Sequence, residues 1–536
     1  MASSDKVTTT SPPLSDEEHL AKLGYKQEFF RHLGLFDNWA ATFTCINFVG
    51  GIPVLFGWAM ATGGPAAAFA NWTMVGGLSL AVALVLAEIA AAFPTAGGIY
   101  FWAFRLGGAR WGPFLAWMTA WWNWAGWVCV VPGVQQGATG FVLGALEVAY
   151  PHRADLWGDA WFGWALTAAG LVVAMLPNLL PQRALKLWLR FAVGLFFGLL
   201  ALYWTWFPAM AAVGGHHFQT PAGVFGRFHN GVNTGGDGEA AASDAYCWTV
   251  GLLFGAWVFY GYDTSAHLAE ETHDASATVA KGMWLSTLSA WALSVPTLVL
   301  VLFCIQDFPA LLAAPYANNF TAYLVQLLGP RGAVVVLALL AANATCGSAS
   351  CFLSAQRVTF AISRDGVLPG SRVLRRLTRR HRVPAAAALL VLAVALVVAS
   401  APLALGSAAD VAMAAVAAAA TAATNLSYLI PLAARYTVGR AAFRPAPALR
   451  LGRAGSWLLA PVAAAWIGFL FVVLLLPQRY PVSARSLNYA PVCVGIVAVA
   501  SVVGWVAPWG LGGRYWFAGP RRTLGDVVDA GEDVLT

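Results

Sequence analysis

The chain has 536 residues, of which 59% are hydrophobic and 10% are charged. A soluble domain carries about 25% charged residues, so this chain has too few charged groups to cover a water-facing surface. The composition therefore disfavours a soluble enzyme, a nucleic-acid binder and a disordered scaffold. The net charge of +7 and the 25 tryptophans fit a membrane protein, because basic residues gather in cytoplasmic loops and indole rings settle at the lipid–water interface.

Twelve apolar stretches are long enough for membrane-spanning helices, which need about 20 mostly apolar residues. This pattern predicts an all-α polytopic membrane protein. The stretches lie near 39–62, 66–93, 113–147, 159–177, 184–208, 246–271, 279–305, 331–362, 384–402, 408–434, 457–477 and 490–510.

The charges of the loops predict the orientation. Residues 1–38 contain no apolar run and are expected in the cytoplasm; 25 Lys and Arg then fall on the inner side and 5 on the outer side. Such an excess of inner positive charge sets membrane topology, so the tail at 511–536 is expected inside as well. The Arg-rich stretch 372–382 is then a cytoplasmic loop that meets anionic lipid rather than a nucleic-acid site. The glycosylation sequon at Asn319 falls on the predicted outer side.

Two stretches are interrupted at mid-membrane. Stretch 39–62 carries a Gly-Gly pair and a proline within 49–53, and stretch 246–271 carries Gly261. Glycine permits non-helical dihedrals and proline removes a backbone donor, and unpaired backbone groups survive at that depth only where they line a cavity. Two breaks five spans apart indicate an inverted-repeat transporter with a midplane binding site. Close helix packing at small residues is the alternative explanation of either break alone.

Asp263 directly follows the second break. An acid at bilayer depth costs ~2.5–3.5 kcal/mol and marks a functional group by default. We expect a carboxylate that takes up a proton together with the substrate; an acid that is neutral, or satisfied by the free N–H groups of the broken helix, is the structural alternative. Glu270 and Glu271 lie two turns further on and are expected to be gate or interface charges. Arg190 and Glu88, near inner helix ends, are expected to reach the inner surface.

Aromatic rings near the second break can hold a cationic amine, because a ring face attracts an ammonium within about 6 Å of its centroid. Trp257 and Tyr260 precede the break by one turn or less and are expected to face the substrate. The predicted site consists of Val49, Gly50, Gly51, Ile52, Trp257, Tyr260, Gly261 and Tyr262 for the substrate, with Asp263 as the candidate for proton coupling.

Short motifs recur in order along nearly the whole chain. They are LGYKQE at 23–28, ATGGP at 61–65, FPTAGGIY at 93–100, GYDTSAHLAEE at 261–271, SRDGVLP at 363–369, NYA at 488–490 and FAGP at 517–520. This ordered set resembles the amino acid–polyamine–organocation (APC) superfamily, and within it the amino acid/choline transporter group best known from fungi.

The resemblance implies a LeuT-type fold of two inverted five-helix repeats, here 39–208 and 246–434, followed by two further helices in 457–510. It also implies proton-linked uptake or exchange of amino acids or related amines, such as γ-aminobutyrate (GABA) or choline.

Residue by residue, the resemblance implies that Val49, Gly50 and Gly51 bind the substrate carboxylate through backbone N–H groups. Trp257 falls on a substrate-covering aromatic residue, Gly261 on the break, and Asp263 on a proton-sensing acid of some relatives. The sequence departs from the pattern at Val49, where a small polar residue is common, and in having Pro53 just after the break.

The expected function is therefore secondary active transport, in the plasma membrane, with a small-molecule substrate, protons and membrane lipid as partners and no nucleic acid. A nutrient sensor that keeps the fold without transporting is the alternative, but sensors often carry longer cytoplasmic extensions than those found here. No catalytic motif such as HExxH or Gly-x-Ser-x-Gly and no phosphate-binding loop occurs, so neither an enzyme nor an ATP-driven pump is expected. The scattered cysteines and the His216–His217 pair, which has no third ligand nearby, predict neither metal nor cofactor.

Overall fold

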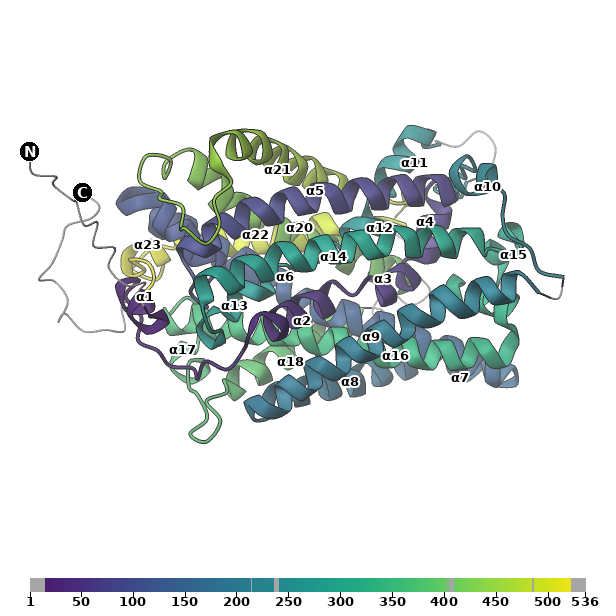
Figure 1. The fold of residues 1–536 in the computed structure, drawn as a ribbon, viewed down its shortest axis with the longest axis horizontal. Coiled ribbons are helices and arrows are strands. Elements are labelled where there is room, and N and C mark those ends of the chain that lie inside the picture. The colour runs from purple at the N-terminus through teal and green to yellow at the C-terminus, as the bar shows by residue number, and fades with distance from the viewer. Residues whose placement is uncertain are drawn as a thin grey trace, which may run out of the picture.

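The computed structural model describes residues 15–213, 215–235, 241–401, 403, 409–483 and 486–521. Regular structure in these ranges is helical, apart from three isolated β-bridges. The long helices run side by side and form an elongated bundle (Figure 1).

Eight helices of the described residues are long and apolar enough to cross a membrane, and two further apolar helices are shorter. α6 and α16 are the longest, and each is bent at one glycine, Gly108 (φ +63°) and Gly329 (φ +72°). The eight are α5 (Gly64–Ala92), α6 (Ile99–Ala149), α8 (Ala160–Met175) continued by η2 (Leu176–Leu179), α9 (Gln182–Ala211), α14 (Ala275–Phe303), α16 (Asn319–Arg364), α20 (Ala409–Tyr436) and α21 (Gly452–Leu475), and the shorter two are α18 (Ala385–Ala399) and α22 (Ala490–Val506).

The other two predicted spans are interrupted, as expected. The first consists of α2 (Leu35–Ile46), α3 (Phe48–Val54) and α4 (Phe56–Ala61), and the second of α11 (Asp244–Val250), α12 (Leu253–Ala256), α13 (Thr264–His267) and η3 (Ala269–Glu271). The described residues thus contain a helical segment in each of the twelve predicted spans. The division into two repeats stays a prediction.

The first break does not lie at its glycines. The helix ends at Asn47, which is left-handed (φ +30°), and is interrupted again at Leu55, whereas Gly50 and Gly51 are part of α3. Asparagine tolerates this conformation because its short polar side chain can bond the local backbone, and Asn47 caps the next turn in that way. The second break does lie at its glycine, since Gly261 has a φ of +81°.

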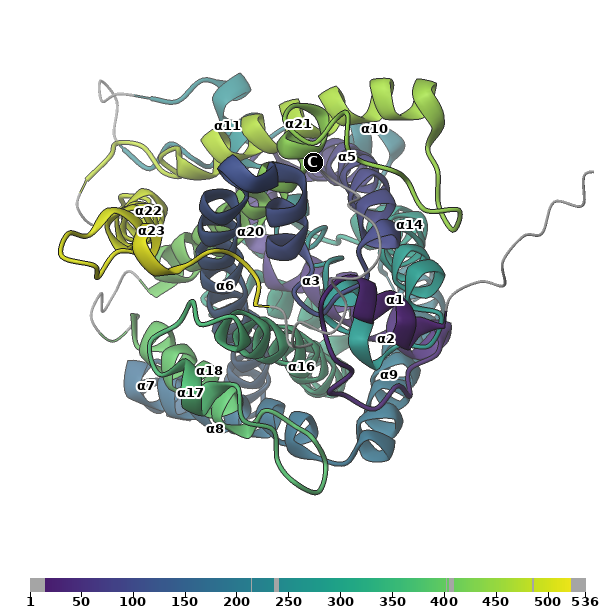
Figure 2. The same cartoon turned by 90° about the vertical axis from the view of Figure 1, so that its left-hand side faces the viewer.

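The interrupted segments lie inside the bundle. Seen along the bundle, α3 occupies the middle, surrounded by α5, α6, α14 and α16 (Figure 2). α6 packs along α16 and α20, and α14 packs along α5 and α2. The breaks are thus enclosed by helices rather than exposed at the side of the bundle.

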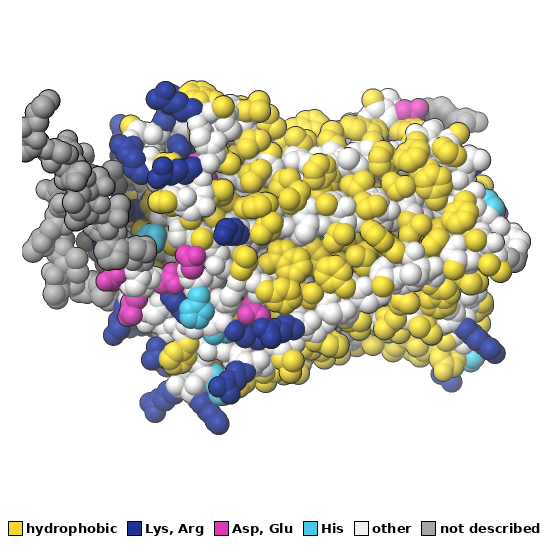
Figure 3. All heavy atoms as spheres, in the orientation of Figure 1, with side chains coloured by type: hydrophobic (Ala, Val, Ile, Leu, Met, Phe, Trp, Pro, Cys, Tyr) yellow, Lys and Arg dark blue, Asp and Glu magenta, His cyan; other side chains and the backbone are white. Residues whose placement is uncertain are grey.

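The bundle has two distinct ends. The end that carries α1 (Asp16–Lys22), α17 (Ser371–Leu374) and α23 (Gly513–Trp516) is called the α1 end below; the opposite one, with α10 (Pro221–Phe225), α11 and α15 (Phe308–Ala313), is called the α10 end (Figure 1). Lys and Arg side chains gather at the α1 end, and apolar side chains cover the flank between the two ends (Figure 3). Leu187 of α9 and Val397 of α18 are 71% and 72% exposed, as expected of helices that face lipid.

Candidate functional site

The two breaks touch each other. A Cβ atom on Gly51 of α3 would lie 2.5 Å from Val258 Cγ2, and one on Gly261 would lie 3.2 Å from Cys45 Sγ. Only residues without a side chain allow such an approach, so Gly51 and Gly261 are where the interrupted spans pack. Gly51, predicted from the sequence to bind the substrate, thus packs against Val258 in the structure.

The backbone N–H groups predicted to bind a carboxylate have partners within their own turn. Gly50 N–H donates to Asn47 Oδ1 (3.3 Å) and Gly51 N–H donates to Asn47 O (2.9 Å). The carbonyl of Val49 accepts from Tyr203 Oη (3.3 Å). A substrate carboxylate at this turn would therefore replace the Asn47 amide oxygen. Sequence reasoning missed Asn47, although an asparagine just before a helical turn is a common N-cap.

Asp263 is completely buried and accepts four hydrogen bonds from side chains. Tyr428 Oη donates to Oδ1 (2.6 Å), and His267 Nε2 (3.0 Å), Trp127 Nε1 (3.0 Å) and Asn123 Nδ2 (3.1 Å) reach Oδ2. Burying a carboxylate is costly unless donors replace its water. These donors from α6, α13 and α20 hold Asp263 as an acceptor.

His267 extends this network toward the α1 end. Its ring is 1% exposed, and its second nitrogen, Nδ1, faces Ala96 O at 3.4 Å. The N–H group of Ala96 donates to Glu270 Oε1 (3.1 Å), so Ala96 links His267 to Glu270. His267 is not among the residues predicted from the sequence. Its spacing of four residues from Asp263 could have indicated it, because that spacing puts both side chains on one helix face.

The predicted aromatic residues separate into two groups. Trp257 packs on α6, where a Cβ atom on Gly133 would lie 2.8 Å from its ring, and its centroid lies 5.8 Å from that of Tyr260. Tyr262 instead packs on Tyr428 (5.0 Å) beside the carboxylate network. Ile52 is fully buried in the core.

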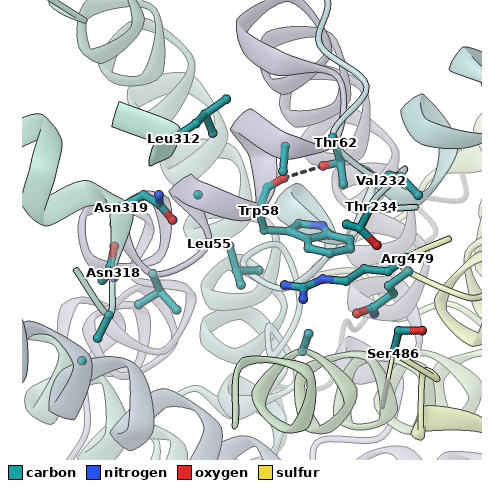
Figure 4. Close-up of a pocket in the computed structure, with 18 of the residues that line it drawn as sticks. Leu55, Trp58, Thr62, Val232, Thr234, Leu312, Asn318, Asn319, Arg479 and Ser486 are labelled. Atoms are coloured by element: carbon teal, nitrogen blue, oxygen red, sulfur yellow. Dashed lines mark hydrogen bonds between the residues drawn. The ribbon is translucent and has the colours of Figure 1, made fainter. Parts of the chain in front are cut away.

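A cavity of about 410 Å³ lies beyond the breaks, toward the α10 end (Figure 4). None of the nine predicted site residues lines this cavity; its wall begins at Val54, which contacts the position of Gly137. Gly133, against which Trp257 packs, lies one turn before Gly137 in α6. Other lining residues are Leu55, Trp58, Thr62, Gly140, Val232, Thr234, Asn318, Asn319, Arg479 and Ser486.

The α1 end is closed by buried ion pairs. Arg364 pairs with Glu270 (3.1 Å) and Arg357 pairs with Glu271 (2.6 Å), and all four side chains are less than 5% exposed. Each pair joins η3 of the broken span to α16. Removing one partner of such a pair destabilises the protein, because the other charge stays buried without a partner. The predicted role of Glu270 and Glu271 as gate or interface charges fits these contacts, which are called the seal below.

Two other charges have partners that the sequence did not indicate. Arg190 is 58% exposed, as expected of a residue that reaches the surface, but it also pairs with Asp37 (3.3 Å). The expectation for Glu88 is wrong: this side chain is 2% exposed, accepts from Leu451 N (3.0 Å) and faces Arg435 (3.8 Å). Burial is tolerated because a cation and a backbone donor replace water.

Residues 36–499 match the family model described as amino acid permease. The chain belongs to the amino acid permease family. The permease is 32% identical over 528 residues to the amino-acid permease BAT1 homolog of Oryza sativa subsp. japonica, covering 94% of this chain and 95% of that protein. It is 30% identical to the amino-acid permease BAT1 of Arabidopsis thaliana, covering 95% and 97% of the two chains.

A relative named for a different substrate is similar over almost the same length. The permease is 29% identical over 511 residues to the thiamine transporter thi9 of Schizosaccharomyces pombe, covering 91% of this chain and 85% of that one. The resemblance to the APC superfamily is thus confirmed. The permease is a multi-pass membrane transporter of amino acids or related compounds, and it is not an enzyme.

The contact between the breaks gives a first prediction. Gly51→Ala should destabilise the permease by about 1–3 kcal/mol, the usual cost of overpacking, because its methyl group meets Val258. Val258→Ala in the same chain should restore most of the loss by removing Cγ2. Melting temperatures of the purified variants measure both effects. Gly198→Ala is the control, since no atom lies within 4 Å of its added Cβ; equal melting temperatures of Gly51→Ala and Gly198→Ala would contradict the packing role.

Proposed function

We propose that the permease is a secondary active transporter that moves an amino acid or a related amine together with a proton. The observation that carries this proposal is the Asp263–His267 pair, two titratable side chains that are 0% and 1% exposed beside a helix break. Ionisable groups within membrane spans mark proton or substrate pathways.

The surroundings favour His267 as the member of the pair that gains and loses the proton. Tyr428 Oη, Trp127 Nε1 and Asn123 Nδ2 donate to Asp263, so three donors besides His267 hold its carboxylate as an acceptor. Both ring nitrogens of His267 face oxygen acceptors, Asp263 Oδ2 and Ala96 O, so an imidazolium satisfies both. We therefore assign the coupled proton to His267, with Asp263 as its counter-charge.

The position of the pair supports coupling between the proton and access to the substrate site. His267 contacts the carbonyl of Ala96, whose N–H group donates to Glu270, and Glu270 pairs with Arg364 in the seal. Three contacts therefore connect His267 to the ion pairs that close the α1 end. Coupling requires that the charge of His267 change the stability of the closed state relative to the open state.

The distribution of charge supports an orientation with the α1 end in the cytoplasm, because inner loops carry the excess of Lys and Arg. The cavity at the α10 end then faces outward and offers the entry route. We propose the plasma membrane as the location, with both termini inside.

The substrate class rests on the relatives and on the rings. Two relatives are named amino-acid permeases and one a thiamine transporter, and thiamine, like choline, carries a cationic nitrogen. Trp257 and Tyr260 supply ring faces for such a cation or for a substrate ammonium. For an amino acid or γ-aminobutyrate, the Gly50 and Gly51 N–H groups are the candidates for the carboxylate.

His267→Gln should separate proton coupling from transport. The amide still donates to Asp263 but does not titrate, so the variant should exchange substrate and fail to accumulate it along an inward proton gradient. Asp263→Asn should show the same loss, because it removes the counter-charge. Gradient-driven uptake and counterflow exchange, measured in proteoliposomes, test both variants.

Tyr428→Phe is the matched control, because it removes one donor from Asp263 without removing a titrating member of the pair. Accumulation by this control should still respond to the gradient. Normal gradient-driven accumulation by His267→Gln would rule out the histidine as proton carrier.

A panel of labelled compounds should identify the substrate. We expect uptake into proteoliposomes of at least one of γ-aminobutyrate, neutral amino acids, basic amino acids, choline and thiamine, with stimulation by an inward proton gradient. Trp257→Ala should weaken uptake of that compound more than Trp257→Phe, because phenylalanine keeps a ring face. Binding without any net uptake across the panel would favour the nutrient sensor instead.

A further inference from the structure

A second cavity, at the α1 end, has the chemistry of an anion site. It encloses about 410 Å³ between the end of α16 and α17, and its charged lining residues are all arginines: Arg372, Arg375 and Arg521. Among the described residues no carboxylate lies within ion-pair distance of these three side chains. Three cations around one cavity repel one another, and an anion between them relieves that repulsion.

A buried hydroxyl in the same wall also lacks a partner. Ser363 is fully buried, and its Oγ makes no hydrogen bond within the protein. Buried hydroxyl groups are nearly always hydrogen-bonded because the unpaired state is costly. An acceptor oxygen in the cavity that Ser363 lines would satisfy it.

We propose that this cavity binds the phosphate group of an anionic lipid. Arginine is suited to phosphate because its planar guanidinium donates two parallel hydrogen bonds. Ser363 supplies a further donor, whereas the hydroxyl of Ser371 in the same wall donates to Leu368 O.

The surroundings favour a lipid over a free phosphate compound. α17 lies at the periphery of the α1 end and packs on α18, one of the apolar helices (Figure 2). Val373 lies between Arg372 and Arg375, is 53% exposed and lines the cavity. Basic residues that alternate with an exposed apolar side chain are typical of contact with anionic membranes.

The cavity and the seal share a wall. Ser363 and Gly366 flank Arg364 and Asp365; Arg364 pairs with Glu270, and Asp365 accepts from the N–H group of Arg521 (2.9 Å). Asp365 also accepts from Tyr25 (3.1 Å) and Tyr100. A phosphate that fixes Arg521 and Ser363 therefore stabilises the closed α1 end, and lipid binding regulates the step in which that end opens.

The test uses the purified full chain and dioctanoyl phosphatidic acid, a soluble lipid with a phosphomonoester. This lipid should raise the melting temperature, because it binds the folded state, whereas dioctanoyl phosphatidylcholine should not. Arg372→Gln/Arg375→Gln should weaken binding by about ten-fold or more, since two charge-assisted contacts are lost. Ser363→Ala should weaken it less.

The matched control is Arg376→Gln/Arg379→Gln, which removes the same charge from the same loop outside the cavity. This variant should bind the lipid nearly as well as the parent chain. Equal weakening in the two double variants would overturn the proposal, because it would mean general surface attraction. Glycerol 3-phosphate binding as tightly as the lipid would overturn the assignment to a lipid. None of these readouts depends on transport, so they stand apart from proton coupling.

Discussion

A buried carboxylate at a helix break is the constraint around which this permease is organised. Asp263 is completely buried and therefore needs donors, and it obtains them from three elements: Asn123 and Trp127 of α6, His267 of α13 and Tyr428 of α20. Tyr428 Oη also accepts the N–H group of Gly261 (3.2 Å), a group that the break leaves without a helical partner. The same side chains thus compensate the charge and the interrupted backbone, and they fix the broken span between α6 and α20.

The two ends of the bundle differ in what closes them. At the α1 end, ion pairs and the tyrosines around Asp365 join η3, α16 and the segment before α2. At the α10 end, a cavity reaches inward as far as Val54. The α1 end is therefore held by buried charges, whereas the α10 end contains a cavity lined by both polar and apolar residues.

Much of the fold follows from local composition. Long apolar stretches had to become helices, because a membrane offers no partner for a free backbone, and the glycines and the acid of the second break predicted its position correctly. The first break was harder to place. Gly50 and Gly51 are as permissive as Gly261, yet they stay helical and serve close packing on Val258, while Asn47 turns the chain. Whether the chain turns at Asn47 or at the glycines depends on the side chains that pack against each position.

The sequence by itself determined the class of protein, the helices, the interrupted spans and the place of Asp263 beside the second break, since these depend on hydrophobic length, glycine and an isolated charge. The tertiary structure alone decided the partners: His267 and Tyr428 for Asp263, Arg364 for Glu270, Arg435 for Glu88, and the arginines that surround the second cavity. Hydrogen bonds and ion pairs are short-ranged. Residues hundreds of positions apart form them only after the helices have packed, so no local pattern in the chain records them.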